Sequence, residues 1–226
     1  MNRKEVQERI EEIGIIPGIR VSEAADALMA AEAVASGGIP IVEVTMTVPD
    51  AFFVMSALKK ARPEMIVGAG TVLDVETAVR CLDAGAMFLT SPGLDLEIVD
   101  FALRRDTFVF PGAMTPSDVM AARKAGVEFV KIFPCMQLGG PAYIKALKAP
   151  FPHVPMIASG GVDQGNVAEF ILAGATAVGI GAHLIPKKAI ELRQPDRIHE
   201  LAVRFATMVR EARRQRAGEW GVSGSV

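Results

Sequence analysis

The stretch VEFVKIF, at residues 127–133, has the length and the branched and aromatic side chains of a buried strand. Side chains alternate between the two faces of a strand, so positions 127, 129, 131 and 133 share one face. Lys131 is therefore surrounded on its own face by large apolar residues, close to the C-terminal end of the strand. Lysine is among the residue types least often buried without a partner, so this placement needs a chemical reason.

Similar short apolar runs recur along the chain, separated by alanine-rich stretches of helical length. This alternation predicts a parallel sheet with crossover helices, and eight strands are the number that closes a barrel. Strands are expected at 15–20, 40–45, 65–69, 87–90, 107–111, 127–133, 154–158 and 177–180. Helices are expected at 22–36, 49–61, 74–84, 94–104, 116–125, 141–148, 164–173 and 195–216. The predicted fold class is α/β, with a single (β/α)8 TIM barrel.

The barrel is expected to form one domain over residues 1–226, because no low-complexity linker divides the chain. Residues 1–13 are rich in charge and predict an N-terminal helix. They lack the apolar centre and the cleavage site of a secretory signal. The segment 218–226 contains glycine and serine and is expected to be a flexible tail.

The composition predicts a cytoplasmic enzyme that acts on a small molecule. A formal net charge of -2 and a pI near 6.0 provide no positive field for nucleic acid or for an anionic membrane. No run of residues approaches the roughly 18 apolar positions of a membrane span. The two cysteines form no CxxC pair, and the three histidines form no cluster with carboxylates, so no metal is expected.

Glu43, like Lys131, is an ionisable residue in a strand that is predicted to be buried. In IVEVT, residues 41–45, the acid shares one face with Ile41 and Thr45, near the end at which such barrels carry catalytic groups. Apolar surroundings favour the neutral amine of a lysine, which can attack a ketone and form a Schiff base. A carboxylate within reach can move the protons that this cycle requires. The alternative is a purely structural ion pair between the two side chains.

Glycine-rich turns follow three of the predicted strands. GAGT at 68–71 lets the backbone approach a ligand closely, and its threonine can donate a hydrogen bond to a carboxylate. SGGV at 159–162 and GIGA at 179–182 follow the seventh and eighth strands, where barrels commonly bind phosphate through backbone amides. These turns predict a phosphorylated substrate, although tight turns alone also require glycine.

Six short motifs occur in a fixed order along the predicted barrel. They are VEVT (42–45), VGAGTVL (67–73), SPG (91–93), PGAMTP (111–116), VKIFP (130–134) and SGGV (159–162). With them the chain resembles the 2-keto-3-deoxy-6-phosphogluconate aldolase family, from about residue 15 to residue 183. The resemblance implies a class I aldolase on a (β/α)8 barrel, a homotrimer without cofactor. Its implied reaction splits a 2-keto-3-deoxy sugar acid, 6-phosphorylated as the gluconate or its galactonate epimer, into pyruvate and an aldehyde such as glyceraldehyde 3-phosphate.

The resemblance also implies roles for individual residues. Lys131 is then the lysine that forms the Schiff base, and Glu43 is the general acid and base. The positions that match the pocket around the pyruvyl portion of the substrate are Thr71, Pro92 and Phe133. The positions that match the phosphate-binding end are Gly160, Gly161 and Gly181.

Two positions depart from the family's pattern. Thr47 stands where the phosphogluconate enzymes have the arginine that binds the substrate carboxylate. Arg20 is the candidate replacement, since the phosphogalactonate branch is similar in carrying an arginine there; the alternative is that Arg20 pairs with a structural acid. Ala182 stands where the family often has a serine that binds phosphate, so one hydroxyl donor is missing.

Three other functions remain open at this point. An aldolase for 4-hydroxy-2-oxoglutarate or for an unphosphorylated keto-deoxy acid suits a site without that arginine and serine. A phosphosugar isomerase or a thiamin-phosphate-type synthase shares the glycine-rich turns, but it has no need for an interior pair of Lys131 and Glu43. The third alternative is a barrel that binds such ligands without turning them over.

Overall fold

The computed structural model describes residue 1 and residues 3–222, and for residues 219–222 it describes the backbone alone. Its strands are β1 (Ile15–Ile19), β2 (Ile41–Thr45), β3 (Ile66–Gly70), β4 (Phe88–Thr90), β5 (Phe108–Phe110), β6 (Gly112–Ala113), β7 (Val130–Ile132), β8 (Met156–Ser159) and β9 (Ala177–Ile180). Its helices are α1 (Arg3–Ile13), α2 (Ala24–Ser36), α3 (Ala51–Ala61), α4 (Val75–Asp83), α5 (Leu96–Arg104), α6 (Pro116–Lys124), η1 (Met136–Leu138, a 3-10 helix), α7 (Gly140–Lys148), α8 (Val167–Leu172), α9 (Lys187–Glu191) and α10 (Pro195–Val222). None of the described helices is long and apolar enough to span a bilayer.

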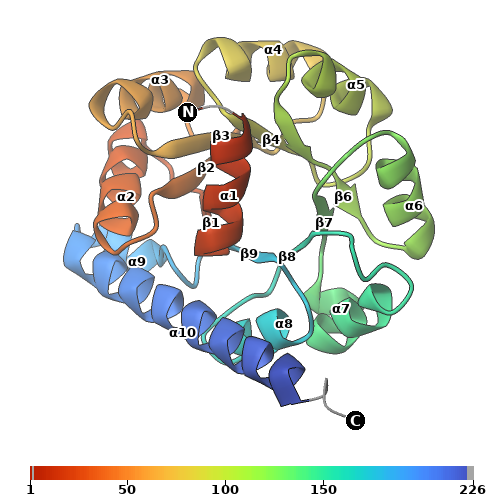
Figure 1. Cartoon of the computed structure of the whole chain (residues 1–226). Coiled ribbons are helices and arrows are strands. Elements are labelled where there is room, and N and C mark those ends of the chain that lie inside the picture. Colours follow the sequence, from red (N-terminus) through yellow and green to blue (C-terminus); the bar gives the residue numbers. More distant parts are fainter. Residues whose placement is uncertain (2, 223–226) are drawn as a thin grey trace.

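The strands form a parallel sheet that curls into a barrel, with helices around the outside (Figure 1). Their order is β5-β4-β3-β2-β1-β9-β8-β7-β6. The two end strands are halves of one extended segment, because only Pro111 separates β5 from β6. The first half pairs with β4 and the second half pairs with β7. The chain itself therefore closes the barrel, and β5 and β6 together occupy one strand position.

The predicted (β/α)8 barrel with an N-terminal helix is confirmed, and each predicted strand matches an observed one. The strand predicted at 107–111 continues to residue 113, because its last residues pair with β7 on the opposite side. The sequence patterns missed η1 and α9, which are too short to show a helical period. The tail predicted at 218–226 is helical as far as Val222, and residues 223–226 lie outside the described residues.

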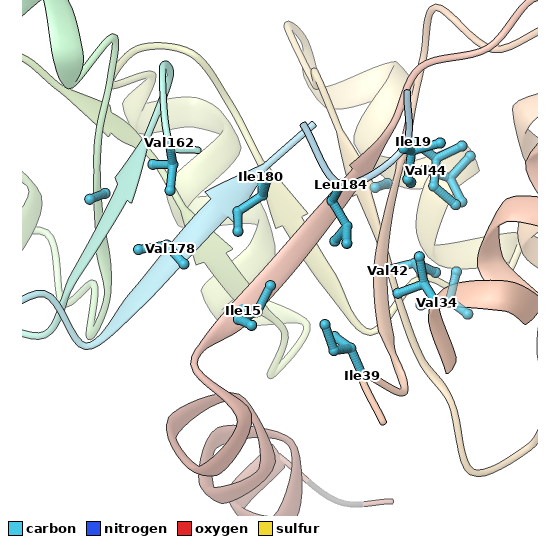
Figure 2. Close-up of a cluster of buried hydrophobic side chains, with 14 of the residues drawn as sticks. Ile15, Ile19, Val34, Ile39, Val42, Val44, Val162, Val178, Ile180 and Leu184 are labelled. Carbon is cyan, nitrogen blue, oxygen red and sulfur yellow. The ribbon is translucent and has the colours of Figure 1, made fainter. Parts of the chain in front are cut away.

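Residues of each strand alternate between the surrounding helices and the barrel interior. The apolar residues that face the helices form one continuous buried cluster, and Figure 2 shows its part around β1, β2 and β9. The labelled members are Ile15, Ile19, Val34, Ile39, Val42, Val44, Val162, Val178, Ile180 and Leu184. This packing fixes the register, since a shift of one residue would turn the polar interior side chains of a strand towards the helices.

The N-terminal end of the barrel interior is filled by an aromatic floor. This floor consists of Phe88, Phe108, Phe110 and Phe129, with ring centroids 5.1 to 6.2 Å apart. Val6 and Ile10 of α1 belong to the same buried cluster, and α1 lies across the barrel in Figure 1. Arg3 holds α1 in place, since its guanidinium lies 2.7 Å from Glu128 Oε2 and stacks over the Phe108 ring. Among the residues that the structure describes, the floor and α1 fill the N-terminal end of the interior, which leaves the C-terminal end for a site.

The last helix, α10, packs along both α8 and α2. Arg213 of this helix donates hydrogen bonds to the carbonyl oxygens of Glu12 and Thr176, and Arg216 donates one to that of Ile171. These bonds join α10 to the end of α1, to α8 and to the residue before β9. The final helix thus connects the first and last units of the barrel.

A capping box starts α6, in the segment that leads out of β6. Thr115 Oγ1 accepts a hydrogen bond from the Asp118 N–H, and the Asp118 carboxylate accepts from the N–H groups of Met114 and Thr115 at 2.9 and 2.8 Å. These bonds, chiefly the one from Met114, hold the pKa of Asp118 below its usual value. Ionised Asp118 therefore stabilises the folded state.

We expect Asp118→Asn to lower the free energy of unfolding at pH 7 by about 0.3–1 kcal/mol, the usual value of an acid at a helix N-terminus. A folded-state pKa below the unfolded value gives stability above the unfolded pKa that is lost as pH falls through the folded pKa. Urea denaturation from pH 7 downwards should therefore show the gap between variant and wild type narrowing below about pH 4. Ser117→Ala, in the same turn, is the control. A gap that does not change with pH would contradict this role of Asp118.

Candidate functional site

Lys131 lies inside the barrel on β7, two residues beyond Phe129 of the aromatic floor. Only 7% of its surface is exposed. Its Nζ lies 4.0 Å from Glu43 Oε2 and donates a 3.4 Å hydrogen bond to Thr90 Oγ1. The ring centroid of Phe133 is 5.5 Å from the same Nζ. The amine therefore faces one carboxylate and one hydroxyl in otherwise apolar surroundings.

Glu43 reaches Lys131 from β2 and is equally buried, with 7% of its surface exposed. Its partners in the sheet register are Gly18 of β1 and Gly68 of β3. The space of a Cβ at Gly68 is taken by the Phe88 ring, whereas a Cβ at Gly18 would meet only the Ile180 carbonyl oxygen, at 4.0 Å. Gly70, at the end of β3, is needed as well, because a Cβ there would overlap the Glu43 carboxylate and the Thr90 hydroxyl. Glycines on the adjacent strands thus make room for the acid.

A cavity of about 200 Å³ opens beside Lys131 and Glu43, and we call it the inner cavity. Gly160 and Gly161 form part of its wall directly after β8, with φ angles of 91° and 84°. Glycine adopts such positive φ angles without strain. The inner cavity therefore lies at the C-terminal ends of the strands, with the reactive amine at its base.

A larger cavity of about 590 Å³ adjoins the inner one, and we call it the outer cavity. It lies between the β1–α2 and β9–α9 connections, and both cavities are lined by Gly18, Arg20 and Ala182. Arg20 forms no ion pair with any residue that the structure describes, so the alternative of a structural acid partner is not observed. Its guanidinium is available to a ligand at the boundary of the two cavities.

The structure brings most of the predicted site residues together. Those that line the inner cavity are Arg20, Glu43, Lys131, Phe133, Gly160, Gly161, Gly181 and Ala182. Thr47 lines only the outer cavity, where its hydroxyl lies 2.7 Å from that of Thr45. Thr71 and Pro92 follow β3 and β4 at the same end of the barrel but line neither cavity. Their contact with the substrate stays a prediction.

Thr90, the hydrogen-bond partner of Lys131, was not among the residues predicted for the site. The signal was present in the sequence, because Phe88 and Thr90 are two residues apart on one strand and must share a face. Phe88 belongs to the aromatic floor, so the next inward position on β4 lies at the level of the site. Alternation on a three-residue strand would therefore have placed the hydroxyl in the interior.

The other reactive groups of the chain are poor candidates for the chemistry. Burial raises the pKa of the thiols of Cys81 and Cys135 to about 12, so neither is a thiolate at neutral pH. Within the described ranges, His, Cys, Asp and Glu form no group of three that could hold a metal ion. The arrangement at the inner cavity instead offers an amine that can attack a carbonyl carbon, next to a carboxylate that can exchange protons.

Comparisons with known proteins agree with this chemistry. A family model described as KDPG and KHG aldolase matches residues 6–201. A 2-dehydro-3-deoxy-phosphogluconate aldolase of Pseudomonas aeruginosa is 34% identical over 180 residues, which make up 80% of this chain and 82% of that protein. A KHG/KDPG aldolase of Escherichia coli is 34% identical over 189 residues, 83% of this chain and 88% of that protein.

Solved structures give the same result. The KDPG aldolase of Legionella pneumophila, with pyruvate captured at low pH as a covalent carbinolamine intermediate, has a TM-score of 0.81 and 32% sequence identity to this chain. The match covers 86% of this chain and 95% of that one. Because the family model spans most of the barrel and full-length relatives are this similar, the chain belongs to the KDPG and KHG aldolase family.

Proposed function

We propose that the protein is a class I aldolase that splits a 2-keto-3-deoxy sugar acid into pyruvate and an aldehyde through a Schiff base on Lys131. The observation that carries the proposal is the buried Lys131 amine, 4.0 Å from Glu43 Oε2 at the base of the inner cavity. Membership of the aldolase family supports it. The Legionella relative supports it further, since pyruvate forms a covalent carbinolamine in that protein.

The reaction begins when the Lys131 amine attacks the C2 ketone, and loss of water from the carbinolamine gives an iminium ion. The iminium withdraws electrons from the C3–C4 bond. Glu43 takes the proton of the C4 hydroxyl, directly or through one water, and the C3–C4 bond breaks. Its electron pair forms an enamine on Lys131, and C4 leaves as the aldehyde. Protonation at C3 followed by hydrolysis releases pyruvate and restores the amine, so the iminium serves as the electron sink.

The surroundings of Lys131 suit this sequence of steps. Thr90 accepts a hydrogen bond from Nζ and so orients the amine towards the inner cavity. Phe133 borders that cavity and offers an apolar surface to the methylene and methyl groups of the pyruvyl portion. The aromatic floor closes the barrel beneath the amine, so substrate enters from the C-terminal end of the strands.

We propose 2-keto-3-deoxy-6-phosphogluconate, or its galactonate epimer, as the substrate, with glyceraldehyde 3-phosphate as the aldehyde. Gly160, Gly161 and Gly181 line the inner cavity where barrels bind phosphate through backbone amides. Arg20 replaces the carboxylate ligand that is missing at Thr47. The alternative substrate is 4-hydroxy-2-oxoglutarate, because Ala182 lacks a hydroxyl donor and the Escherichia coli relative is a KHG/KDPG aldolase.

We further propose that the protein is a cytoplasmic homotrimer. Large apolar side chains are exposed on consecutive units of the barrel, from α3 to α6, which are neighbours in the ring of helices (Figure 1). They are Phe53, Leu73, Leu96, Met114 and Met120. Exposed apolar side chains concentrated on one side of a protein favour contacts with another subunit.

Borohydride reduction in the presence of pyruvate should attach a three-carbon fragment to Lys131, because hydride converts the iminium into a stable amine. Peptide mass mapping locates the label. We expect Lys131→Met to lose both labelling and pyruvate release, and Lys124→Met, an exposed lysine on α6, to keep both. An unlabelled Lys131 peptide in an enzyme that still releases pyruvate would rule out the mechanism.

Glu43→Gln should lower kcat for cleavage by about 10²–10⁴-fold, the usual contribution of general acid and base catalysis. Borohydride trapping should persist, though more slowly, because Lys131 remains in place. Glu64→Gln, which alters an exposed carboxylate, is the control for kinetics. If kcat of Glu43→Gln equals that of the wild type, Glu43 is only a structural partner of Lys131.

Light scattering coupled to size-exclusion chromatography should give a mass three times that of the 24.0 kDa chain. A charge introduced by Phe53→Glu on α3 should weaken the assembly, so the mass should fall as the protein is diluted. Leu192→Glu changes an exposed apolar residue outside this sector and should leave the mass unchanged. A wild-type mass of one chain refutes the trimer, and a stable Phe53→Glu trimer refutes this surface.

A further inference from the structure

The inner cavity is smaller than the roughly 300–1,000 Å³ of typical ligand sites, whereas the outer cavity lies within that range. The two adjoin at Gly18, Arg20 and Ala182. Ala182 carries only a methyl group, so no long side chain from that position separates them. A substrate that is bound covalently to Lys131 can therefore extend its far end past Ala182 into the outer cavity.

The outer cavity has a balanced set of charged side chains. The basic ones are Arg20, Lys187 and Arg193, and the acidic ones are Glu23, Asp26 and Glu191. Lys187 and Glu191 neutralise one another, with Nζ 3.5 Å from Oε1. Once Arg20 binds the substrate carboxylate, Arg193 remains with Glu23 and Asp26, so the outer cavity does not favour a second anionic group. Its side chains suit hydroxyl groups, each of which donates one hydrogen bond and accepts two.

Asp26 is the most informative residue of the outer cavity. Only 7% of its surface is exposed, yet it makes no hydrogen bond or ion pair within the described part of the chain. Neither carboxylate oxygen of Asp26 is closed off from solvent, so the carboxylate keeps its access through the outer cavity that it lines. Its place in the first turn of α2 favours an acid through the helix dipole, but that interaction does not require burial. Asp26 is thus a hydrogen-bond acceptor directed at the contents of the cavity.

We propose that the outer cavity is a subsite for a neutral, polyhydroxylated tail, so that the enzyme also cleaves 2-keto-3-deoxy acids longer than six carbons. Asp26 accepts hydrogen bonds from hydroxyls of that tail, and Ile185 and Ile190 contact its carbon chain. This inference rests on the Schiff-base function proposed above. The bonds made and broken are the same, and the C3–C4 cleavage releases a longer hydroxylated aldehyde in place of glyceraldehyde 3-phosphate.

The test compares two substrates in an assay of pyruvate release. One is 2-keto-3-deoxy-6-phosphogluconate, and the other is an unphosphorylated eight-carbon acid, 3-deoxyoctulosonate. We expect the wild type to cleave both acids. Asp26→Leu should lower kcat/KM for the eight-carbon acid at least tenfold and leave the phosphorylated acid within threefold. Ring closure lowers the concentration of the open-chain acid by the same factor for variant and wild type. The ratio of their kcat/KM values on one substrate therefore does not depend on it.

Two further variants make the result specific. Asp26→Asn keeps the shape of the side chain and one acceptor oxygen, so it should lose less activity on the eight-carbon acid than Asp26→Leu, and it serves if the leucine variant does not fold. Glu32→Leu makes the same kind of change on an exposed position of α2 and should behave as the wild type.

The outcomes separate this subsite from the aldolase function. Cleavage of the phosphorylated acid alone by the wild type overturns the subsite and leaves the aldolase standing. An equal loss of both activities in Asp26→Leu and Asp26→Asn assigns Asp26 a structural role and also overturns it. Failure to cleave either acid, together with no pyruvate adduct on Lys131, overturns both proposals.

Discussion

Lys131 and Glu43 form a buried pair, with Nζ 4.0 Å from Oε2. This pair constrains which residues can line the barrel interior at the C-terminal ends of the strands. Two ionisable groups that are removed from water are stable only where polar partners and space are provided. Thr90 supplies one partner, and glycines at 18 and 70 supply the space. The aromatic floor shields the pair from the N-terminal side. The needs of Lys131 and Glu43 therefore explain why the neighbouring strands β1, β3 and β4 carry glycine or threonine at their inward positions near the site.

The N-terminal and C-terminal ends of the barrel interior have different roles, although the same alternation of inward and outward side chains forms both. Inward positions near the start of the strands carry bulky residues, such as Phe88 and Phe129, which fill the barrel and contact α1. Inward positions two residues later are small or polar, as at Gly18 and Thr90, and leave the inner cavity open. Stability is thus concentrated at one end and chemistry at the other, as TIM barrels generally divide them.

Features that depend on the local period of side chains along a strand were predictable from the sequence. Features that depend on contacts between segments distant in the sequence were not. Lys131 and Glu43 were placed correctly in the interior because a period of two fixes the face of each residue on its strand. The split of one strand into β5 and β6 was missed, because it arises only when both neighbours are present. The position of Asp26 in the outer cavity was missed as well, since part of that cavity is formed by the β9–α9 connection, which is distant in sequence. Local patterns carry no information about such neighbours.

The contacts of α10 have a consequence for how the chain acquires its structure during synthesis. Arg213 and Arg216 donate hydrogen bonds to carbonyl oxygens in the first and the last parts of the barrel sequence. The helix also covers α2 and α8. Until α10 has left the ribosome, the faces of α2 and α8 that it covers stay exposed. A nascent chain that lacks this helix therefore exposes apolar surface, and the barrel gains this cover only after residues 195–222 have been synthesised.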